Sequence, residues 1–345
     1  MSVQPALTQP IPPGGDWWNL SDAKARRRRN LLLLSIIAVF FVFALANVAF
    51  SVDTDGDGDD DLSDCDINDP NKFSPVNMTV LNNTHITFCN GTYRDLSINL
   101  SGYNESIKCN GTTFVGMGNS YEGSLFRLLD PTNGIKNLTI QNCFVVNYSM
   151  FVDLQFQNEN RTREDIWLLN NTLTNMTRRT AAGDGPYGFR LNGNYSHLVI
   201  ANNYLTTFRQ LYSTDWGAGI IVSGSNLGIF MQNASIYGNS VLDFGCSVNR
   251  CKMAGIVVQT GNPAGGGNVS VFNNTVGFSR CHDPAGCTLV GIGHVSNGSV
   301  NIFNNTIAQL SSSLYAAGIL VTSWNGTNIT ENTFTNISVL DTVYE

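Results

Sequence analysis

Charged side chains are scarce in this sequence, and a net basic region is missing beyond its first thirty residues. Only 13% of the 345 residues are charged, and 33 are glycine. Fourteen of the nineteen Lys and Arg residues and fifteen of the twenty-six Asp and Glu residues lie beyond residue 70. A basic surface for nucleic acid is therefore not expected. The composition also disfavours a charge-covered helical bundle and favours short strands joined by tight turns.

One apolar segment is long enough to span a membrane as a helix. Residues 31–50 read LLLLSIIAVFFVFALANVAF and carry no charge. At about 1.5 Å rise per residue, a helix of this length matches a hydrocarbon core roughly 30 Å thick, which predicts one transmembrane helix. The alternative is a signal peptide cleaved near Ala44 and Ala46, but its apolar part would exceed the usual length of roughly 7 to 15 residues.

The flanking charges orient this helix. Arg26, Arg27, Arg28 and Arg29 precede it, and aspartates follow it. The positive-inside rule therefore predicts a single-pass protein of the cell membrane, with its N-terminus cytoplasmic and its C-terminus extracellular. Residues 1–30 are expected to be a disordered tail. Residues 31–50 would then be a signal anchor, residues 51–74 an Asp-rich linker, and residues 75–345 the extracellular domain.

The linker has the spacing of a calcium-binding loop. Counted from Asp53, glycine falls at the sixth position and Asp64 at the twelfth. Ca²⁺ binds six to eight oxygen ligands, which alternate aspartates around a glycine turn can supply. The candidate ligands are Asp53, Asp55, Asp57, Asp59, Asp61 and Asp64. A structural Ca²⁺ that stiffens the linker is the favoured interpretation, and a solvated acidic spacer is the alternative.

The same segment resembles known calcium motifs. It is similar to thrombospondin type 3 repeats and to EF-hand-like loops, although it lacks Glu at the twelfth position and a flanking helix pair. Residues 64–70, DCDINDP, resemble a metal-binding motif of prokaryotic surface proteins.

Potential N-glycosylation sites are unusually frequent beyond the apolar segment. Twenty Asn-X-Ser/Thr sequons occur there, where composition alone predicts roughly 7. They begin at Asn77, Asn82, Asn90, Asn99, Asn104, Asn110, Asn137, Asn147, Asn160, Asn170, Asn175, Asn194, Asn233, Asn268, Asn273, Asn297, Asn304, Asn325, Asn328 and Asn336. The excess predicts an exported glycoprotein, in which sugars keep a charge-poor domain soluble.

A repeat of about 30 residues runs through the large region. One half of it reads NLTIQNCF at 137, IWLLNNTL at 166, LVIANNYL at 198, ASIYGNSV at 234, VSVFNNTV at 269, VNIFNNTI at 300 and TNITENTF at 327. The shared asparagines are Asn142, Asn171, Asn203, Asn239, Asn274, Asn305 and Asn332. The other half reads GFRL at 188, GIIV at 219, GIVV at 255, GIGHV at 291 and GILV at 318.

This period indicates a solenoid, and its two short alternating segments per repeat indicate strands. In a parallel β-helix the strands of successive coils pair in register, and a corner Asn can stack as a hydrogen-bonded ladder. The predicted fold is therefore all-β, a right-handed parallel β-helix preceded by one transmembrane helix. The asparagine column is expected to be structural rather than catalytic.

Here the chain resembles the pectate-lyase-like right-handed β-helix superfamily, over roughly residues 75–345. The first coils carry this similarity in Cys109, Asn110, Gly111, Gly116 and Asn142. It is most marked for prokaryotic repeat proteins related to periplasmic copper-processing and carbohydrate-binding proteins. A shared fold of this kind says little about function. Copper handling would need clustered Met or His, and these residues are scattered.

The cysteines predict disulfides, because all eight lie in the exported part and their number is even. They are Cys65, Cys89, Cys109, Cys143, Cys246, Cys251, Cys281 and Cys287. Cys246 with Cys251 and Cys281 with Cys287 either close local loops or cross-link neighbouring coils. Cys89 with Cys109 is expected as a third pair. A zinc site is disfavoured because no CxxC pair occurs.

An enzyme is the alternative hypothesis, because the superfamily includes polysaccharide lyases, polygalacturonases and epimerases. STD at 213–215 and GIGH at 291–294 look like partial copies of polygalacturonase motifs, while the paired aspartate and the RIK motif are missing. The catalytic candidates are Asp215, Asp243 and His294, with the two aspartates as the carboxylates that glycoside hydrolysis needs. Each is also explained as a turn or strand residue.

The favoured hypothesis is a non-enzymatic surface protein, of archaeal type, for adhesion, for binding extracellular glycans or proteins, or for envelope structure. Its loop aromatics, Tyr187, Tyr212, Trp216 and Trp324, are candidates for stacking on sugars. The repeat continues almost to Glu345 without an evident polar cap. Because solenoid ends need cover, a short cap or end-on self-association is expected.

Overall fold

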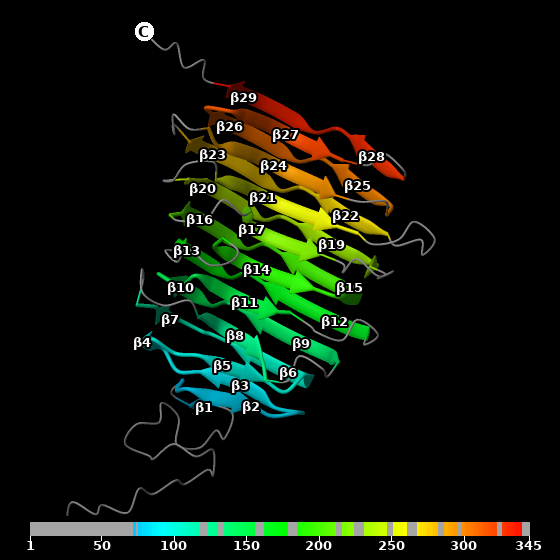
Figure 1. The fold of residues 1–345 in the computed structure, drawn as a ribbon. Helices are drawn as coiled ribbons and strands as arrows, with labels where there is room; N and C mark the ends of the chain where they lie inside the picture. Colours follow the sequence, from blue (N-terminus) through cyan, green and yellow to red (C-terminus); the bar gives the residue numbers. More distant parts are fainter. Residues whose placement is uncertain are drawn as a thin grey trace, which may run out of the picture. The chain divides into compact units, whose positions relative to one another are not determined.

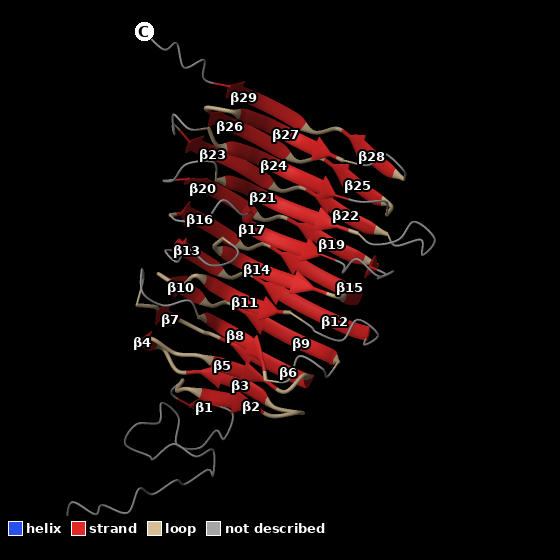
Figure 2. Cartoon of the chain, in the orientation of Figure 1, coloured by secondary structure: helices blue, strands red, loops and turns tan. Residues whose placement is uncertain are grey.

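The computed structural model describes residues 72–73, 75–117, 123–129, 134–155, 162–178, 185–211, 216–223, 231–246, 251–260, 268–281, 286–295, 298–322 and 326–339. The chain divides into two compact units, Met1–Val52 and Asp53–Glu345, and all described residues belong to the second. Their regular structure is entirely β-strand (Figure 2). Within these ranges no helix has the length and apolarity to cross a bilayer. The predicted membrane helix at 31–50 lies outside them.

The strands form three parallel sheets, which we name A, B and C (Figure 1). Sheet A contains β1 (Lys72–Phe73), β3 (His85–Phe88), β6 (Tyr103–Lys108), β9 (Ile135–Gln141), β12 (Thr162–Leu169), β15 (Asn194–Ala201), β18 (Met231–Gln232), β19 (Ala234–Tyr237), β22 (Val269–Phe272), β25 (Val300–Phe303) and β28 (Thr327–Thr330). Sheet B contains β2 (Met78–Val80), β5 (Ile98–Leu100), β8 (Ser124–Leu128), β11 (Met150–Leu154), β14 (Tyr187–Asn192), β17 (Trp216–Ser223), β21 (Lys252–Gln259), β24 (Thr288–Val295) and β27 (Tyr315–Val321). Sheet C contains β4 (Gly91–Arg94), β7 (Thr112–Val115), β10 (Phe144–Val146), β13 (Thr172–Arg178), β16 (Tyr204–Gln210), β20 (Ser240–Cys246), β23 (Thr275–Cys281), β26 (Thr306–Ser312) and β29 (Thr333–Val339).

The chain visits the sheets in the repeating order B, A, C, so that each coil adds one strand to each sheet. From β2 to β29 this order occurs nine times, with β18 and β19 sharing one position in sheet A. Every strand pair is parallel and joins equivalent residues of successive coils, as in Ile220 with Ile256 and Ile256 with Ile292. The all-β, parallel and coiled character of the prediction is therefore confirmed.

Alternation along each strand fills the interior. In β22 and β25 the pattern is buried–intermediate–buried–intermediate, so every second side chain points inward. In the first coils the inward side chains include an edge-to-face series of aromatic rings with centroids 5.5 to 6.2 Å apart. The series runs through Phe88, Phe114, Phe126, Phe151 and Phe189. Burial of each such side chain contributes about 1.5–3 kcal/mol to stability.

A buried asparagine ladder lies at the turn from sheet A to sheet C. Each member donates its side-chain amide to the side-chain oxygen of the next member, at 2.9 to 3.0 Å, except Asn332, which is the last. Each also donates its side-chain amide to a main-chain carbonyl of the preceding coil. The members are Asn171, Asn203, Asn239, Asn274, Asn305 and Asn332. Because each amide is paired on both sides, burial leaves no polar group unsatisfied.

Asn142 was expected in this ladder and does not belong to it. Its place is taken by Cys143, whose N–H donates to the side-chain oxygen of Asn171 at 3.0 Å. Asn142 is exposed and has φ 62°, which corresponds to the residue before each ladder asparagine. The sequence alignment was therefore off by one residue in this coil.

The disulfides follow the coil geometry. Cys246–Cys251 and Cys281–Cys287 close locally, as one of the two predicted alternatives. Cys109 pairs with Cys143 in the next coil, so the expected pair of Cys109 with Cys89 is wrong. Register explains the error, because Lys108 pairs with Gln141 and the two following cysteines lie at the same corner of adjacent coils.

Left-handed residues recur at three positions of the coil, with φ between 52° and 65°. The turn column between sheets A and C comprises Asn142, Asn170, Asn202, Gly238, Asn273, Asn304 and Glu331. The bulge column within sheet C comprises Asp95, Asn147, Asn175, Thr207, Asp243, Phe278, Gln309 and Asn336. The sheet A column comprises Asn83, Asn104, Asn137, Asp165, His197 and Asn233. Asn tolerates this backbone conformation better than other non-glycine residues, which accounts for much of its abundance.

The last described coil leaves its inner side partly open to solvent. Phe334 is 49% exposed, whereas Ile307, its register partner in the preceding coil, is fully buried. The expected cap or end-on association remains a prediction.

Replacement of a ladder residue should destabilise the protein far more than replacement of its neighbour. Asn203→Ala leaves the Asn171 N–H without its acceptor and opens the amide chain, which should lower the free energy of unfolding by about 2–5 kcal/mol. The matched control is Asn202→Gly, at an exposed residue with φ 57°, where glycine fits the backbone and little change is expected. Denaturant unfolding of the full chain in detergent measures both. Equal losses would contradict a structural role for the ladder.

Candidate functional site

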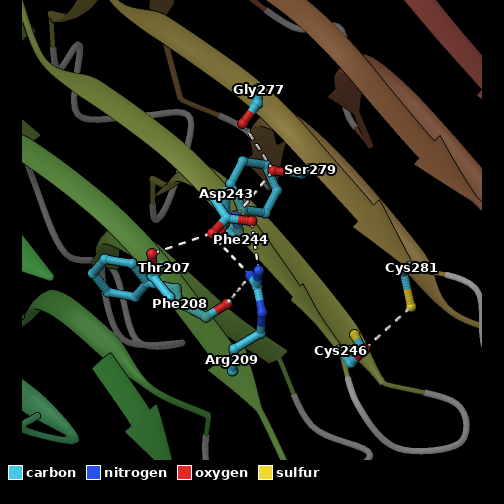
Figure 3. A network of polar contacts seen from close by, with 9 residues as sticks. All are labelled: Thr207, Phe208, Arg209, Asp243, Phe244, Cys246, Gly277, Ser279 and Cys281. Atoms are coloured by element: carbon cyan, nitrogen blue, oxygen red, sulfur yellow. Dashed lines mark hydrogen bonds and ion pairs between the residues drawn. The ribbon is translucent and has the colours of Figure 1, made fainter. Parts of the chain in front are cut away.

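Asp243 belongs to a polar network on the outside of sheet C (Figure 3). It lies in β20 in the bulge column, and its side chain is 42% exposed. Its carboxylate accepts a hydrogen bond from Thr207 at 3.2 Å and pairs with the guanidinium of Arg209 at 2.5 Å. Arg209 also donates to the main-chain oxygens of Phe208 and Asp243. The carboxylate therefore joins two adjacent coils.

His294 is fully buried in β24 and has a different set of partners. Its ring nitrogens lie 3.2 Å from the hydroxyl of Thr260 and 2.9 Å from the hydroxyl of Thr327. Burial lowers the pKa of His294, so the ring is neutral at pH 7. The Thr260 hydroxyl also accepts the N–H of Gly298 at 2.9 Å, so the imidazole holds neighbouring turns together.

The structure does not bring Asp243 and His294 together. They lie in sheets C and B, one exposed and one buried, with separate hydrogen-bond partners. The third catalytic candidate, Asp215, lies outside the described residues. The predicted calcium ligands from Asp53 to Asp64 also lie outside them, and the described ranges contain no cluster of three His, Cys, Asp or Glu residues fit for a metal.

A groove of about 390 Å³ lies on the outer face of sheet B, across β17, β21, β24 and β27. Its floor is formed by the outward side chains of successive coils, and Trp216 lies at one side. The remaining lining residues are Ala218, Ile221, Ala254, Val257, Gln259, Val290, Gly293, Val295, Leu320 and Thr322. Most of these side chains are apolar, with amide and hydroxyl groups only at Gln259 and Thr322.

Gly293 leaves a gap in the floor of this groove. Ile221, Val257, Gly293 and Leu320 are consecutive in register, and only Gly293 lacks a side chain. A Cβ added there would meet nothing closer than Val257 and Val290, each at 3.8 Å. Gly291, two residues earlier, differs because its Cβ would lie 2.5 Å from a main-chain oxygen. Gly291 is therefore required by packing, and Gly293 is not.

The aromatic candidates differ in their accessibility. Trp216 is half-buried beside the groove, with the ammonium of Lys252 5.9 Å from its ring. Tyr187 is only 3% exposed and donates its hydroxyl to the Trp216 carbonyl at 2.7 Å, so the prediction that it serves as a loop aromatic is wrong. Tyr212 and Trp324 lie outside the described residues.

The sequon asparagines that the structure describes lie at the surface. Seventeen of the twenty fall within the described residues, and none of these is buried. The remaining three are Asn160, Asn297 and Asn325. Nine of the seventeen lie in the three left-handed columns.

The fold explains some of the sequons without reference to glycans. At Asn273 the turn requires a left-handed residue, Asn274 belongs to the buried ladder, and Thr275 begins β23. The triplet NNT therefore satisfies three local structural requirements at once. The same holds for the triplets at Asn170 and Asn304.

Glu105 is a buried acid that the sequence did not single out. Its side chain is 1% exposed, and one carboxylate oxygen accepts the N–H groups of Gly102 at 2.8 Å and Ser101 at 2.9 Å. The other oxygen has no hydrogen-bond partner among the described residues. Burial raises the pKa of Glu105 from 4.5 to about 7, against the lowering effect of the two N–H groups.

Comparison with known proteins gives no relative: no family model, no curated protein and no solved structure matches this chain. The site must therefore be interpreted from its own geometry.

Stability should fall between about pH 5 and pH 8 because of Glu105. The folded chain holds the proton up to about pH 7, whereas the unfolded chain releases it near pH 4.5, so the contribution is complete below pH 4.5 and lost as pH rises through 7. The shift corresponds to about 3 kcal/mol. Glu105→Gln should remove this dependence of stability on pH. At pH 8.5 its unfolding midpoint should be higher than that of wild type.

The control is Glu164→Gln, at a side chain 39% exposed and paired with Lys136. Unfolding midpoints of the three chains across this pH range test the assignment. An unchanged slope in Glu105→Gln would refute it.

Proposed function

We propose that this chain is an exported, membrane-anchored and N-glycosylated surface protein that binds a carbohydrate chain along the outer face of sheet B. The groove beside Trp216 is the observation that carries the binding part of this proposal. The same proposal includes a right-handed coil of the pectate-lyase-like type.

The chemistry of the groove suits a sugar. The apolar C–H face of a pyranose packs on aromatic and aliphatic surfaces, which Trp216, Val257 and Leu320 supply. Sugar hydroxyls need hydrogen-bond partners, which Gln259 and Thr322 offer at the opposite side. The gap at Gly293 gives room for one group to enter below the level of neighbouring side chains.

Export and surface display are supported by two features of the described chain. Disulfides persist in oxidising compartments, and three of them join described cysteines. Sequon asparagines that face solvent can carry glycans without disturbing the core. Within this proposal, residues 31–50 are the anchor, and the aspartates from Asp53 to Asp64 hold a Ca²⁺ that stiffens the connection to the solenoid.

Filling the gap should weaken binding while the fold survives. Gly293→Val places two methyl groups in the groove with no backbone clash, so the affinity for the carbohydrate should fall at least tenfold, which corresponds to about 1.4 kcal/mol. Binding of the full-length protein in detergent to an array of surface polysaccharides and oligosaccharides identifies ligands, and titration of a hit with both chains gives the ratio.

The matched control is Ser240→Val, which adds similar bulk to the outer face of sheet C and removes no sequon. It should bind as wild type does. The proposed function fails if no carbohydrate binds wild type, or if Gly293→Val binds as well as wild type.

Calcium removal should affect the linker and leave the solenoid intact. EGTA should make the segment from Asp53 to Asp69 sensitive to protease because unpaired aspartates repel one another, while the melting of the β-structure stays unchanged. Asp57→Asn should give the same sensitivity with Ca²⁺ present. Cleavage that is indifferent to Ca²⁺ in wild type would favour the acidic spacer.

A further inference from the structure

Several sequon asparagines occupy the same column in adjacent coils. Asn104 and Asn137 are neighbours in the sheet A column, because Tyr103 pairs with Lys136 and Glu105 with Leu138. Asn147 and Asn175 are neighbours in the bulge column, and Asn273 and Asn304 are neighbours in the turn column. These pairs are 28 to 33 residues apart in sequence and one strand spacing apart in the fold.

The two members of each pair leave the backbone in the same direction. Their φ values are 53° and 56°, 61° and 54°, and 55° and 54°, so each pair shares one local conformation. Adjacent strands are about 4.8 Å apart. At the third pair this spacing is seen directly, because the preceding residues, Phe272 and Phe303, stack with ring centroids 5.0 Å apart and an interplanar angle of 3°.

In the pair of Asn147 and Asn175 the side chains contact each other, and the nitrogen of one of them is engaged. The side-chain amide of Asn175 donates to the side-chain oxygen of Asn147. This amide nitrogen is the atom that would carry a glycan. Each of the two side chains therefore lies within the space that a sugar on the other would enter.

We propose that each of these pairs is a single acceptor site, so that a folded molecule carries one glycan at Asn104 or Asn137, one at Asn147 or Asn175, and one at Asn273 or Asn304. This inference rests on the proposed N-glycosylation and assigns its pattern. Flat rings can stack at this spacing, as Phe272 and Phe303 do with centroids 5.0 Å apart. Two branched, hydrated pyranose chains that leave side by side at this spacing contact each other from the first sugar outward.

Transfer of the glycan to asparagine is a substitution at the anomeric carbon of the sugar. The side-chain nitrogen of Asn forms a bond to the anomeric carbon of a sugar held on a lipid phosphate. The bond from that carbon to the phosphate oxygen breaks, the phosphate leaves on the lipid, and the amide nitrogen loses one proton. A glycan already present one coil away obstructs this approach in the folded chain, and two glycans added before folding obstruct the pairing of the two coils.

The chain contains matched single sites in the same columns. Asn170 lies in the turn column, and its neighbours Asn142 and Asn202 are not sequons. Asn336 lies in the bulge column beside Gln309. These sites share the backbone conformation of the pairs but have no competing acceptor.

Site occupancy in the full chain, produced in a host that exports and N-glycosylates it, tests the proposal through glycopeptide mass spectrometry. The occupancies of the two members of a pair should sum to no more than one glycan per molecule. Asn170 and Asn336 should each exceed the occupancy of either member of the pair in the same column.

A substitution at the third sequon position shifts the balance without touching an asparagine. Thr306→Val removes the Asn304 sequon and keeps a β-branched residue at the start of β26, and Asn273 should rise toward the occupancy of Asn170. Thr275→Val should raise Asn304 in the same way. Thr306→Ser retains the sequon, and Thr172→Val removes only the Asn170 site, so neither should change Asn273.

The outcomes separate this inference from the proposed function. Glycans at Asn170 and Asn336, together with a pair sum above one, would overturn the single-site assignment and leave the proposed function intact. The assignment would also fail if Asn273 were partly occupied and unchanged in Thr306→Val. A chain without glycans at any sequon would overturn both.

Discussion

Register between coils is the constraint on which the rest of this structure depends. Each strand pairs only with its equivalents in the coils before and after, so a slip of one residue would turn every inward side chain outward. The asparagine ladder prevents such a slip. A displaced Asn239 would lose its acceptor on Asn274 and would deprive the buried Asn203 of its acceptor on Asn239. Apolar columns supply most of the burial, and the ladder supplies the alignment.

The same alignment determines what the outer faces display. A side chain on the surface of one coil has its counterpart about 4.8 Å away in the next, so surface features form lines rather than isolated points. One line carries the floor of the groove at Val257, Gly293 and Leu320. Another carries Asn273 and Asn304, and a third carries Asp243 beside Thr207. Small neighbouring side chains in such a line can form one binding surface together, whereas bulky groups attached to neighbouring side chains exclude each other.

The sequence predicted the fold well because solenoid repeats are local and periodic. Six of the seven asparagines assigned to the ladder are in it. Asn142 is the exception, because the sequence alone does not distinguish a left-handed turn residue from the buried residue that follows it. Cys109 was mispaired for a similar reason, since only register identifies its neighbour as Cys143.

The candidate site was harder to predict from the sequence than the fold. His294 lies in a glycine-rich strand whose sequence does not reveal that its ring points inward. The gap at Gly293 was visible as a departure from the repeat, but only three dimensions make it part of a groove.

Because each coil contacts only its two neighbours, the unit between one ladder asparagine and the next is self-contained. Removal or duplication of one such unit in the gene would leave all other strand pairs, turns and ladder contacts unchanged. The spacings between ladder residues, which range from 27 to 36 residues, show that loops also vary without cost to the pairing. Recombination can therefore lengthen or shorten this protein in whole coils, and the length of the solenoid is open to rapid evolutionary change.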